Sequence, residues 1–248
     1  MNVFAVVVLL ILVIAAVLFY RWYIRDQMEL VTSWDASSEP KVLDADKLER
    51  MNDSASFTFS VWMYHTDWKT TSEPKIIFQR RSGDSGGIEP TYSDSGPKDK
   101  ETFFTMEADA KVPKIRVYVR ENGDDSASFA MCQIERIPIQ RWVSVIVSVN
   151  GDIIDMYLDG KLYKHCEVQK GVKKPNKTSK VYISGGTHAF QGKLSKLEYI
   201  RSDIRPQRAW EIYVDGPRDA SIFGNWLNRY MLRVQWMKDG KVDKEFKV

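Results

Sequence analysis

The chain has 248 residues and a formal net charge of +3 at neutral pH, from 36 basic against 33 acidic residues. This excess is too small to indicate nucleic-acid binding. Hydrophobic residues make up 44% and aromatic residues 12% of the chain, which suits a sizeable core and excludes a disordered tail. Two cysteines, Cys132 and Cys166, are too few for a secreted disulfide scaffold, and whether they pair is open.

An uncharged apolar run, VFAVVVLLILVIAAVLFY, occupies residues 3–20. As a helix with a rise of about 1.5 Å per residue it would be about 27 Å long, close to the thickness of a bilayer's hydrocarbon core. A cleaved signal peptide would have a basic start and a small-x-small cleavage site, and both are missing here. A buried core helix is rarely apolar on every face. We therefore expect residues 1–23 to be an uncleaved transmembrane anchor in the lipid bilayer.

Two arginines, Arg21 and Arg25, follow the apolar run. The positive-inside rule then places the C-terminal domain of this single-pass protein on the cytoplasmic side, and a virion membrane is an alternative location. Against the cytoplasmic orientation stand two sequons, at residues 52–54 and 176–178, which would be glycosylation acceptors in a lumenal domain.

Two irregular stretches interrupt the remaining chain. Residues 24–53 are turn-rich and are expected to be a connector. Residues 80–100 lack hydrophobic periodicity, which is typical of a binding loop or of disorder, so Asp84, Tyr92 and Asp94 are candidate partner contacts. The aspartates of this loop could hold Ca²⁺, but they lack the spacing of a dedicated calcium loop, and no metal site is predicted.

The stretch 161–180 contains seven lysines and one glutamate. A solvated loop between strands is the simpler interpretation, and contact with anionic lipid or an acidic partner is the alternative. The candidate contact residues are Lys170, Lys173, Lys174 and Lys177.

Short segments rich in β-branched and aromatic residues recur between these stretches. Strands are expected at 56–64, 75–79, 102–107, 115–120, 142–149, 153–158, 161–166, 181–184 and 193–200. Asn150-Gly151 and Asp159-Gly160 predict two tight turns that join three of them into a meander. Pro206 and Gly216 bracket an expected helix, and residues 217–248 are expected to add a helix and a hairpin.

The segment 56–64 (SFTFSVWMY) alternates, with its phenylalanines on one face and Trp62 and Tyr64 on the other. On a surface, Trp62 and Tyr64 could stack on a sugar ring or dock a protein partner. The alternative is that C-terminal helices cover this face. Trp142, which opens a later strand, is expected to be buried between two sheets.

Three pieces in chain order resemble laminin-G-like domains of the concanavalin A-like lectin/glucanase superfamily. Residues 57–63 (FTFSVWM) resemble the family's F-T-x-S-x-W strand. Residues 141–161 carry a strand-opening Trp, a polar turn and a YLDGK string, and residues 183–200 resemble the closing glycine-rich region, with Ser195-Lys196 where the family usually has an acidic pair.

The resemblance spans residues 54–216 and implies a mainly β fold, an antiparallel β-sandwich of the concanavalin A-like jelly-roll type. With the flanking segments, we expect this sandwich to carry an N-terminal transmembrane helix and short C-terminal helices. The architecture hosts lectins, adhesion modules, glycanases and structural units, so it implies no single activity.

Catalytic signatures are absent from the sequence. Retaining glucanases of this fold carry E-x-D-x-x-E on one strand, and the nearest string here has Glu107 and Asp109 but Val112 at the second Glu position. Glu107 and Asp109 are instead expected where a strand ends in a turn. Cys166 and His165 are neighbours on a predicted strand and so point to opposite faces, which disfavours a nucleophile–base pair.

We therefore expect a membrane-anchored, non-catalytic interaction or structural protein. Its sandwich would link a membrane to protein partners in a larger assembly, of which a large virus particle is one example. The alternative is a membrane-bound lectin with glycans as ligands, and a glycanase ranks third. No cofactor and no nucleic-acid partner are expected, with Ca²⁺ as the one ion to consider.

Overall fold

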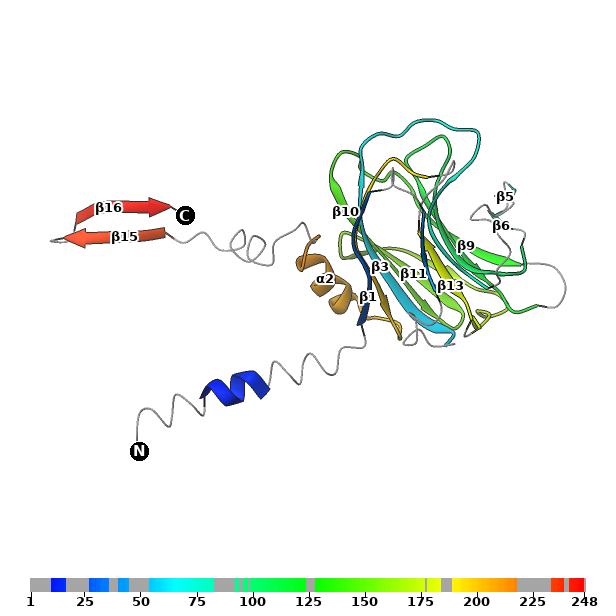
Figure 1. The fold of residues 1–248 in the computed structure, drawn as a ribbon, viewed down its shortest axis with the longest axis horizontal. Coiled ribbons are helices and arrows are strands. Elements are labelled where there is room, and N and C mark those ends of the chain that lie inside the picture. The colour runs from blue at the N-terminus through cyan, green and yellow to red at the C-terminus, as the bar shows by residue number, and fades with distance from the viewer. Residues whose placement is uncertain are drawn as a thin grey trace.

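A computed structural model gives the fold (Figure 1). It describes residues 10–16, 27–35, 40–44, 54–82, 92–93, 96–97, 99–123, 128–176, 178–183 and 189–217, and the backbone of 233–238 and 241–247. Two six-stranded antiparallel sheets pack face to face. The predicted mainly β, antiparallel two-sheet sandwich is confirmed.

Each sheet is built from strands that are distant in sequence. Sheet A contains, in spatial order, β1 (Gln27–Asp35), β14 (Gly192–Ile200), β3 (Ser56–His65), β10 (Trp142–Asn150), β11 (Ile153–Leu158) and β12 (Lys161–Glu167). Sheet B contains β2 (Lys41–Leu43), β13 (Lys180–Ile183), β4 (Lys75–Arg81), β7 (Thr102–Ala108), β8 (Ile115–Arg120) and β9 (Phe129–Ile134).

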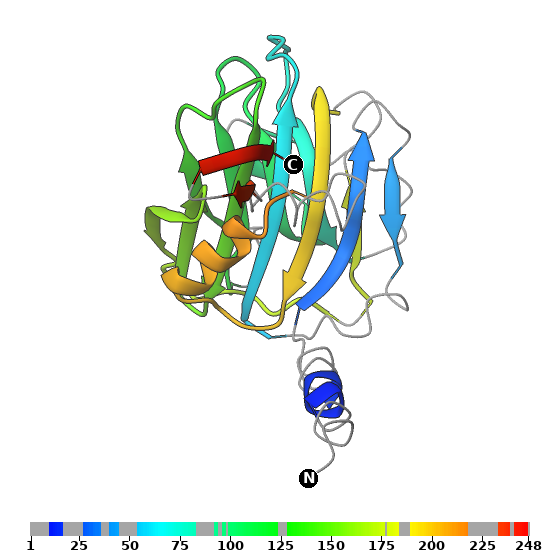
Figure 2. The same ribbon diagram turned by 90° about the vertical axis from the view of Figure 1, so that its left-hand side faces the viewer.

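A helix and two short strand pairs lie outside the two sheets. The helix α2 (Pro206–Val214) lies against the face of sheet A that points away from sheet B (Figure 2). Two short strands, β5 (Tyr92–Ser93) and β6 (Gly96–Pro97), pair with each other, as do β15 (Arg233–Lys238) and β16 (Lys241–Lys247). The last pair lies within residues 217–248, where a hairpin is expected.

Alternation along the strands builds the core between the sheets. The apolar positions of β3 point inward as predicted, and Phe59 is fully buried at the centre. Its ring lies 4.8 Å from that of Phe104, 5.0 Å from that of Phe78 and 5.3 Å from that of Tyr199, measured between centroids. Aromatic residues of both sheets therefore interlock there, a mode of packing that adds specific ring contacts to simple burial.

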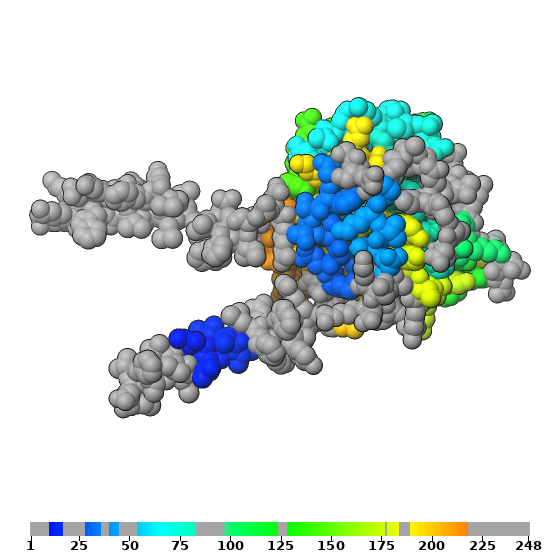
Figure 3. Space-filling model, viewed as in Figure 1, coloured from blue at the N-terminus to red at the C-terminus, as the bar shows by residue number. Residues whose placement is uncertain are grey.

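The sandwich has two flanks, each formed by one edge strand of each sheet. On one flank β1 and β2 lie side by side (Figure 3, blue). On the other, β12 faces β9, and a disulfide between Cys166 and Cys132 joins them, with the two Cα atoms 5.9 Å apart. The two cysteines, whose pairing the sequence leaves open, thus link the two sheets covalently.

The N-terminal boundary of the sandwich differs from the one expected. β1 and β2 lie within residues 24–53, the stretch expected to be a connector, because Val31 and its neighbours pair with β14 and Val42 pairs with β13. The sandwich therefore starts before residue 54. The helix expected after Gly216 falls in residues 218–232, outside the described residues.

The N-terminal run is described only in its middle, where residues 10–16 are helical and exposed. In the described ranges no helix has the length and apolar character needed to cross a membrane. The other residues of the expected anchor, 1–9 and 17–23, lie outside the described part of the chain.

Candidate functional site

Five aromatic side chains gather on the outer face of sheet A and on the helix that lies against it. The rings of Tyr64 and Trp142 are 5.7 Å apart, those of Trp62 and Tyr213 are 5.6 Å apart, and those of Tyr213 and Trp210 are 5.3 Å apart. Trp62 and Tyr64 share one face of β3, which connects the two groups. We call these five residues the aromatic patch.

Strand register places one half of the patch. Val143 points into the core, so Trp142 beside it points outward, directly opposite Tyr64 on β3. The same cross-strand row continues through Lys193 on β14 to Asp35 on β1, both exposed. Tyr64 and Trp142 are half-buried. Two aromatic rings and two charged groups thus form one accessible row.

This orientation corrects the expected position of Trp142. The prediction that its indole lies between the sheets was wrong. The inward positions of β10 are Val143, Val145, Val147 and Val149. The Trp that opens the strand packs instead on Tyr64 at the surface.

The helix α2 supplies the other half of the patch. Its Ala209 and Ile212 are buried against Ile146 and other outward residues of sheet A. Ile212 docks the helix on the sheet, and the next residue, Tyr213, therefore lies over Trp62. The two rings stack with an angle of 17° between their planes. On the exposed side of the helix, Trp210 retains 46% of its accessible surface.

Trp62 is therefore not a free surface residue, since only 5% of it is exposed beneath Tyr213. The prediction that it offers an exposed contact was wrong for this side chain, and the alternative, cover by a C-terminal helix, is correct. Tyr64, which α2 leaves half-buried, stays a candidate contact. Trp210 and Tyr213 were not predicted as contacts, although their spacing of three in an expected helix indicates a shared side of that helix.

The close approach of α2 depends on the turn between β11 and β12. Gly160 there has φ +75°, and a Cβ at this position would lie 2.8 Å from the Cβ of Tyr213 and 3.1 Å from the ring of Trp210. At the same C-terminal end of the helix, the Lys196 ammonium lies 3.4 Å from the Asp215 carboxylate. The turn at Gly160 thus leaves room for α2, and the ion pair lies next to the part of the helix that covers Trp62.

The predicted lysine contacts lie elsewhere. Lys170 and Lys174 are exposed and Lys173 is half-buried, in the segment that follows β12. The amide of Val172 donates to the carbonyl of Gly151, so this segment sits at the β10–β11 turn, at the opposite end of β10 from Trp142. The lysines and the aromatic patch are therefore separate surfaces.

Four further contacts were predicted, and one of them lies within the described residues. Asp84, Asp94 and Lys177 lie outside the described residues. Tyr92 belongs to β5, where its backbone pairs with Pro97.

The strand that resembles the glucanase motif carries an ion-paired cluster on the outer face of sheet B. Arg116 on β8 lies 3.2 Å from a carboxylate oxygen of Glu107 and also pairs with Asp109. Asp109 accepts hydrogen bonds from the amides of Lys111 and Val112, which confirms that the strand ends in a turn. Burial raises the pKa of the Glu107 carboxyl to about 7, although Arg116 acts in the opposite direction. A guanidinium, rather than a second carboxylate, faces Glu107.

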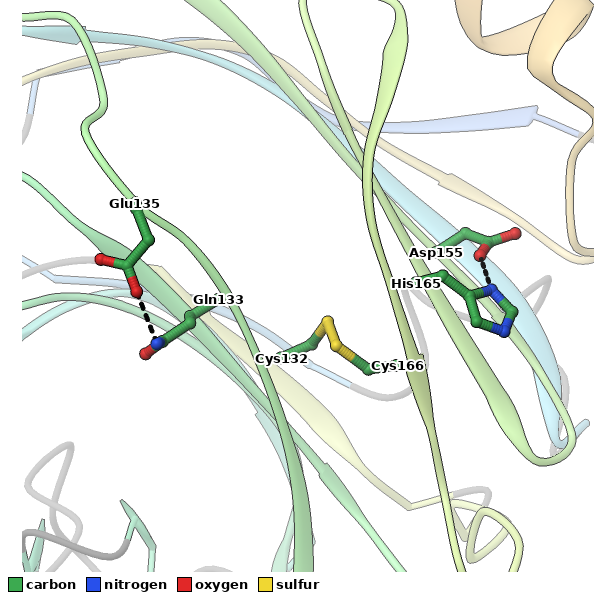
Figure 4. The surroundings of a disulfide bond; sticks show 6 residues. All are labelled: Cys132, Gln133, Glu135, Asp155, His165 and Cys166. Atoms are coloured by element: carbon green, nitrogen blue, oxygen red, sulfur yellow. Dashed lines mark hydrogen bonds and ion pairs between the residues drawn. A yellow bond between two sulfur atoms is a disulfide. The ribbon is translucent and has the colours of Figure 1, made fainter.

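Cys166 and His165 point to opposite faces of β12, as predicted (Figure 4). The sulfur of Cys166 is bonded to Cys132, and the Nδ1 atom of His165 lies 2.7 Å from an Asp155 carboxylate oxygen. Within the ranges that the structure describes, no three His, Cys, Asp or Glu residues are grouped as metal ligands.

Comparisons with known proteins agree with this architecture. The fold is similar to the botulinum neurotoxin serotype D ligand-binding domain in complex with N-acetylneuraminic acid (TM-score 0.53, 9% identity), over 75% of this chain and 43% of that one. It is also similar to the receptor-binding domain of botulinum neurotoxin D (TM-score 0.52, 10% identity), over 84% of this chain and 48% of that one. The chain thus spans less than half the length of these structures, and at such identities the likeness concerns the fold alone.

The comparison with curated proteins found no match. A family model does match, over residues 40–200, and its description is "Concanavalin A-like lectin/glucanases superfamily". The matched range contains every strand of the sandwich except β1. Since the match covers more than half of the chain, this protein belongs to the concanavalin A-like lectin/glucanases superfamily.

Proposed function

We propose that this protein is a non-catalytic binding protein that contacts a protein partner through the aromatic patch. The observation that carries the proposal is the exposure of Trp210, at 46%, on the helix that lies against the same sheet face as the half-buried Tyr64 and Trp142. Trp and Tyr are enriched among the residues that dominate binding energy at protein interfaces, and a rim of polar residues commonly surrounds them. In this protein Lys193 and Asp35 lie in the same cross-strand row as Tyr64 and Trp142.

The ion-paired cluster on sheet B supports a non-catalytic role. A retaining glycosidase needs two carboxyl groups about 5–5.5 Å apart, one of them free to attack the sugar. Here Glu107 is 1% exposed and is ion-paired with Arg116, and Asp109 is held by the same Arg116 and by two backbone amides.

We further propose that residues 3–20 hold the protein in a membrane, so that the sandwich links this membrane to its partner. The length and uniform apolarity of this run support the proposal. The sandwich begins with β1 at Gln27, only a few residues after the run, and would therefore sit close to the bilayer. The full chain should resist extraction from membranes by alkaline carbonate, and release of the full chain would refute the anchor.

The partner proposal is tested by cross-linking mass spectrometry on native membranes or particles that carry the full chain. Lys193, in the same row as Tyr64, and Lys161, next to the Gly160 turn, are the amines that should report contacts at the patch. Trp210→Ala should reduce these cross-links at least tenfold. Tyr163→Ala is the matched control, because Tyr163 is similarly exposed (43%) but contacts Glu135 rather than the patch. Equal loss in both variants, or in neither, would refute the proposal.

A glycan is the second candidate partner. The row that joins Trp142 and Tyr64 to Lys193 and Asp35 sets aromatic rings beside hydrogen-bonding groups, and a sugar ring can use both. A similar fold has been solved with N-acetylneuraminic acid bound. Saturable binding to a glycan array that includes sialylated glycans, lost in Trp142→Ala and kept in Tyr163→Ala, would make the protein a lectin.

A further inference from the structure

The disulfide between Cys132 and Cys166 uses both cysteines of the chain. It joins β9 and β12, the edge strands of two different sheets, on a flank where no backbone ladder connects them. Cys132 is 1% exposed and belongs to the core between the sheets. The bond is therefore part of how this flank is closed.

A structural disulfide indicates the compartment in which a protein matures. Such bonds form and persist in the secretory pathway, on cell surfaces and in periplasms, whereas the cytosol keeps thiols reduced. Arg21 and Arg25 favour the opposite, cytoplasmic placement of the domain, but two arginines give only a weak orientation signal. The cross-sheet disulfide outweighs them.

A second, independent observation is the sequon formed by Asn176, Lys177 and Thr178. Asn176 and Thr178 are both exposed. The carbonyl oxygen of Asn176 accepts hydrogen bonds from the amide and the hydroxyl of Ser179, and that hydroxyl also accepts one from Nε of Arg80. These bonds involve only the main-chain carbonyl of Asn176, and the residue is exposed to solvent.

We propose that the sandwich lies in an oxidising, glycosylating compartment and that Asn176 is an acceptor for an N-linked glycan. The site lies a few residues after Val172, whose amide bonds to the β10–β11 turn. The aromatic rings of Tyr64 and Trp142 lie at the other end of β10. A glycan at Asn176 therefore leaves the aromatic patch accessible to a partner.

The test uses the full chain expressed in cultured mammalian cells, with free thiols trapped by N-ethylmaleimide at lysis. Peptide N-glycosidase F should increase the gel mobility of the wild-type chain. Asn176→Gln and Thr178→Ala should each remove this glycan, whereas Thr178→Ser preserves the sequon and should keep it. Asn176→Gln leaves the turn intact, since the bonds to Ser179 involve only the main-chain carbonyl of Asn176. The other sequon, at Asn52, is removed in a background variant so that a single glycan is scored.

Mass spectrometry of the trapped protein then counts thiols. Neither cysteine should carry N-ethylmaleimide before reduction, and both should react after it. Two alkylated cysteines without reduction, or no glycan at Asn176, would overturn the inference. The inference does not depend on the anchor. A glycosylated chain that carbonate releases would refute only the membrane proposal, and a carbonate-resistant chain with free thiols and no glycan would refute only this one.

Discussion

Arg116 and Glu107 form an ion pair across β8 and β7, with 3.2 Å between a guanidinium nitrogen and a carboxylate oxygen, on a sheet face where Glu107 is 1% exposed. Burial penalises the carboxylate more than Arg116, which also pairs with Asp109, stabilises it. The Glu107 pKa therefore rises to about 7 rather than falling. Such a group makes stability depend on pH near neutrality.

Glu107→Gln should lose less stability than the wild-type protein as the pH rises from 4.5 to 8. Between the ordinary carboxyl pKa of 4.5 and the folded-state pKa of about 7, the folded chain keeps a proton that the unfolded chain has lost. Stability contributed by this group therefore falls as pH rises through that window, by about 3 kcal/mol in all. Urea denaturation at pH 4.5, 6 and 8 measures the effect. A variant with the same pH slope as wild type would contradict the assignment.

His65 should produce the opposite slope. Its ring is buried between Trp68 and Phe190, and this burial, with the nearby Lys75, lowers its pKa from 6.5 to about 4. Between pH 6.5 and 4, His65 is protonated in the unfolded chain but not in the folded chain, so stability is lost as the pH falls through this range. His65→Phe, which cannot titrate, should flatten the loss on the acid side. The same pH series tests it, and a larger acid loss than in wild type would refute it.

The strands and the turns that join them follow from local patterns. Alternation in β3 and β10 fixes which residues enter the core, and Gly151 and Gly160 supply the positive φ values that their tight turns require. These signals are local, so a single sequence contains them. Alternation from Val143 also predicts that the Trp142 side chain points outward. The expectation that it is buried came from the size of the indole, and it was wrong.

The features that define the candidate site depend on contacts between distant segments. Tyr213 reaches Trp62 only because Ala209 and Ile212 dock α2 on sheet A. Cys132 meets Cys166 only because β9 and β12 are both edge strands of facing sheets. Strand order within a sheet is set by the packing of the whole domain, and no periodicity in one segment reports it.

Gly160→Ala should displace α2 from the aromatic patch. The added Cβ would lie 2.8 Å from that of Tyr213, and the residue would also keep an unfavourable φ of +75°. Gly151→Ala is a matched control, since Gly151 has φ +61° in the preceding turn but no atom within 4 Å of its added Cβ. Both variants should lose about 1–2 kcal/mol from backbone strain. Only Gly160→Ala should also shift the tryptophan fluorescence to the red and weaken partner binding, and an unchanged spectrum would contradict this position for α2.

Phe59→Ala and Trp142→Ala should separate stability from binding. Phe59 is fully buried among Phe78, Phe104 and Tyr199, so its truncation should cost about 3–5 kcal/mol. The Trp142 ring is tilted by 59° against that of Tyr64 and is half-buried, so its truncation should cost about 1–2 kcal/mol. Chemical denaturation measures both. An equal loss in the two variants would place the Trp142 indole in the core after all.

Replacing both cysteines by serine should destabilise the sandwich without changing its fold. The bond between Cys132 and Cys166 spans 34 residues and joins the two sheets, so its loss should cost about 3–4 kcal/mol. Thermal melting of the wild-type domain with and without a reductant measures the same quantity independently. The two results should agree, and the double variant should be indifferent to the reductant, because no other cysteine is present in the chain. A wild-type melting temperature that the reductant leaves unchanged would show that β9 and β12 are held together without the bond.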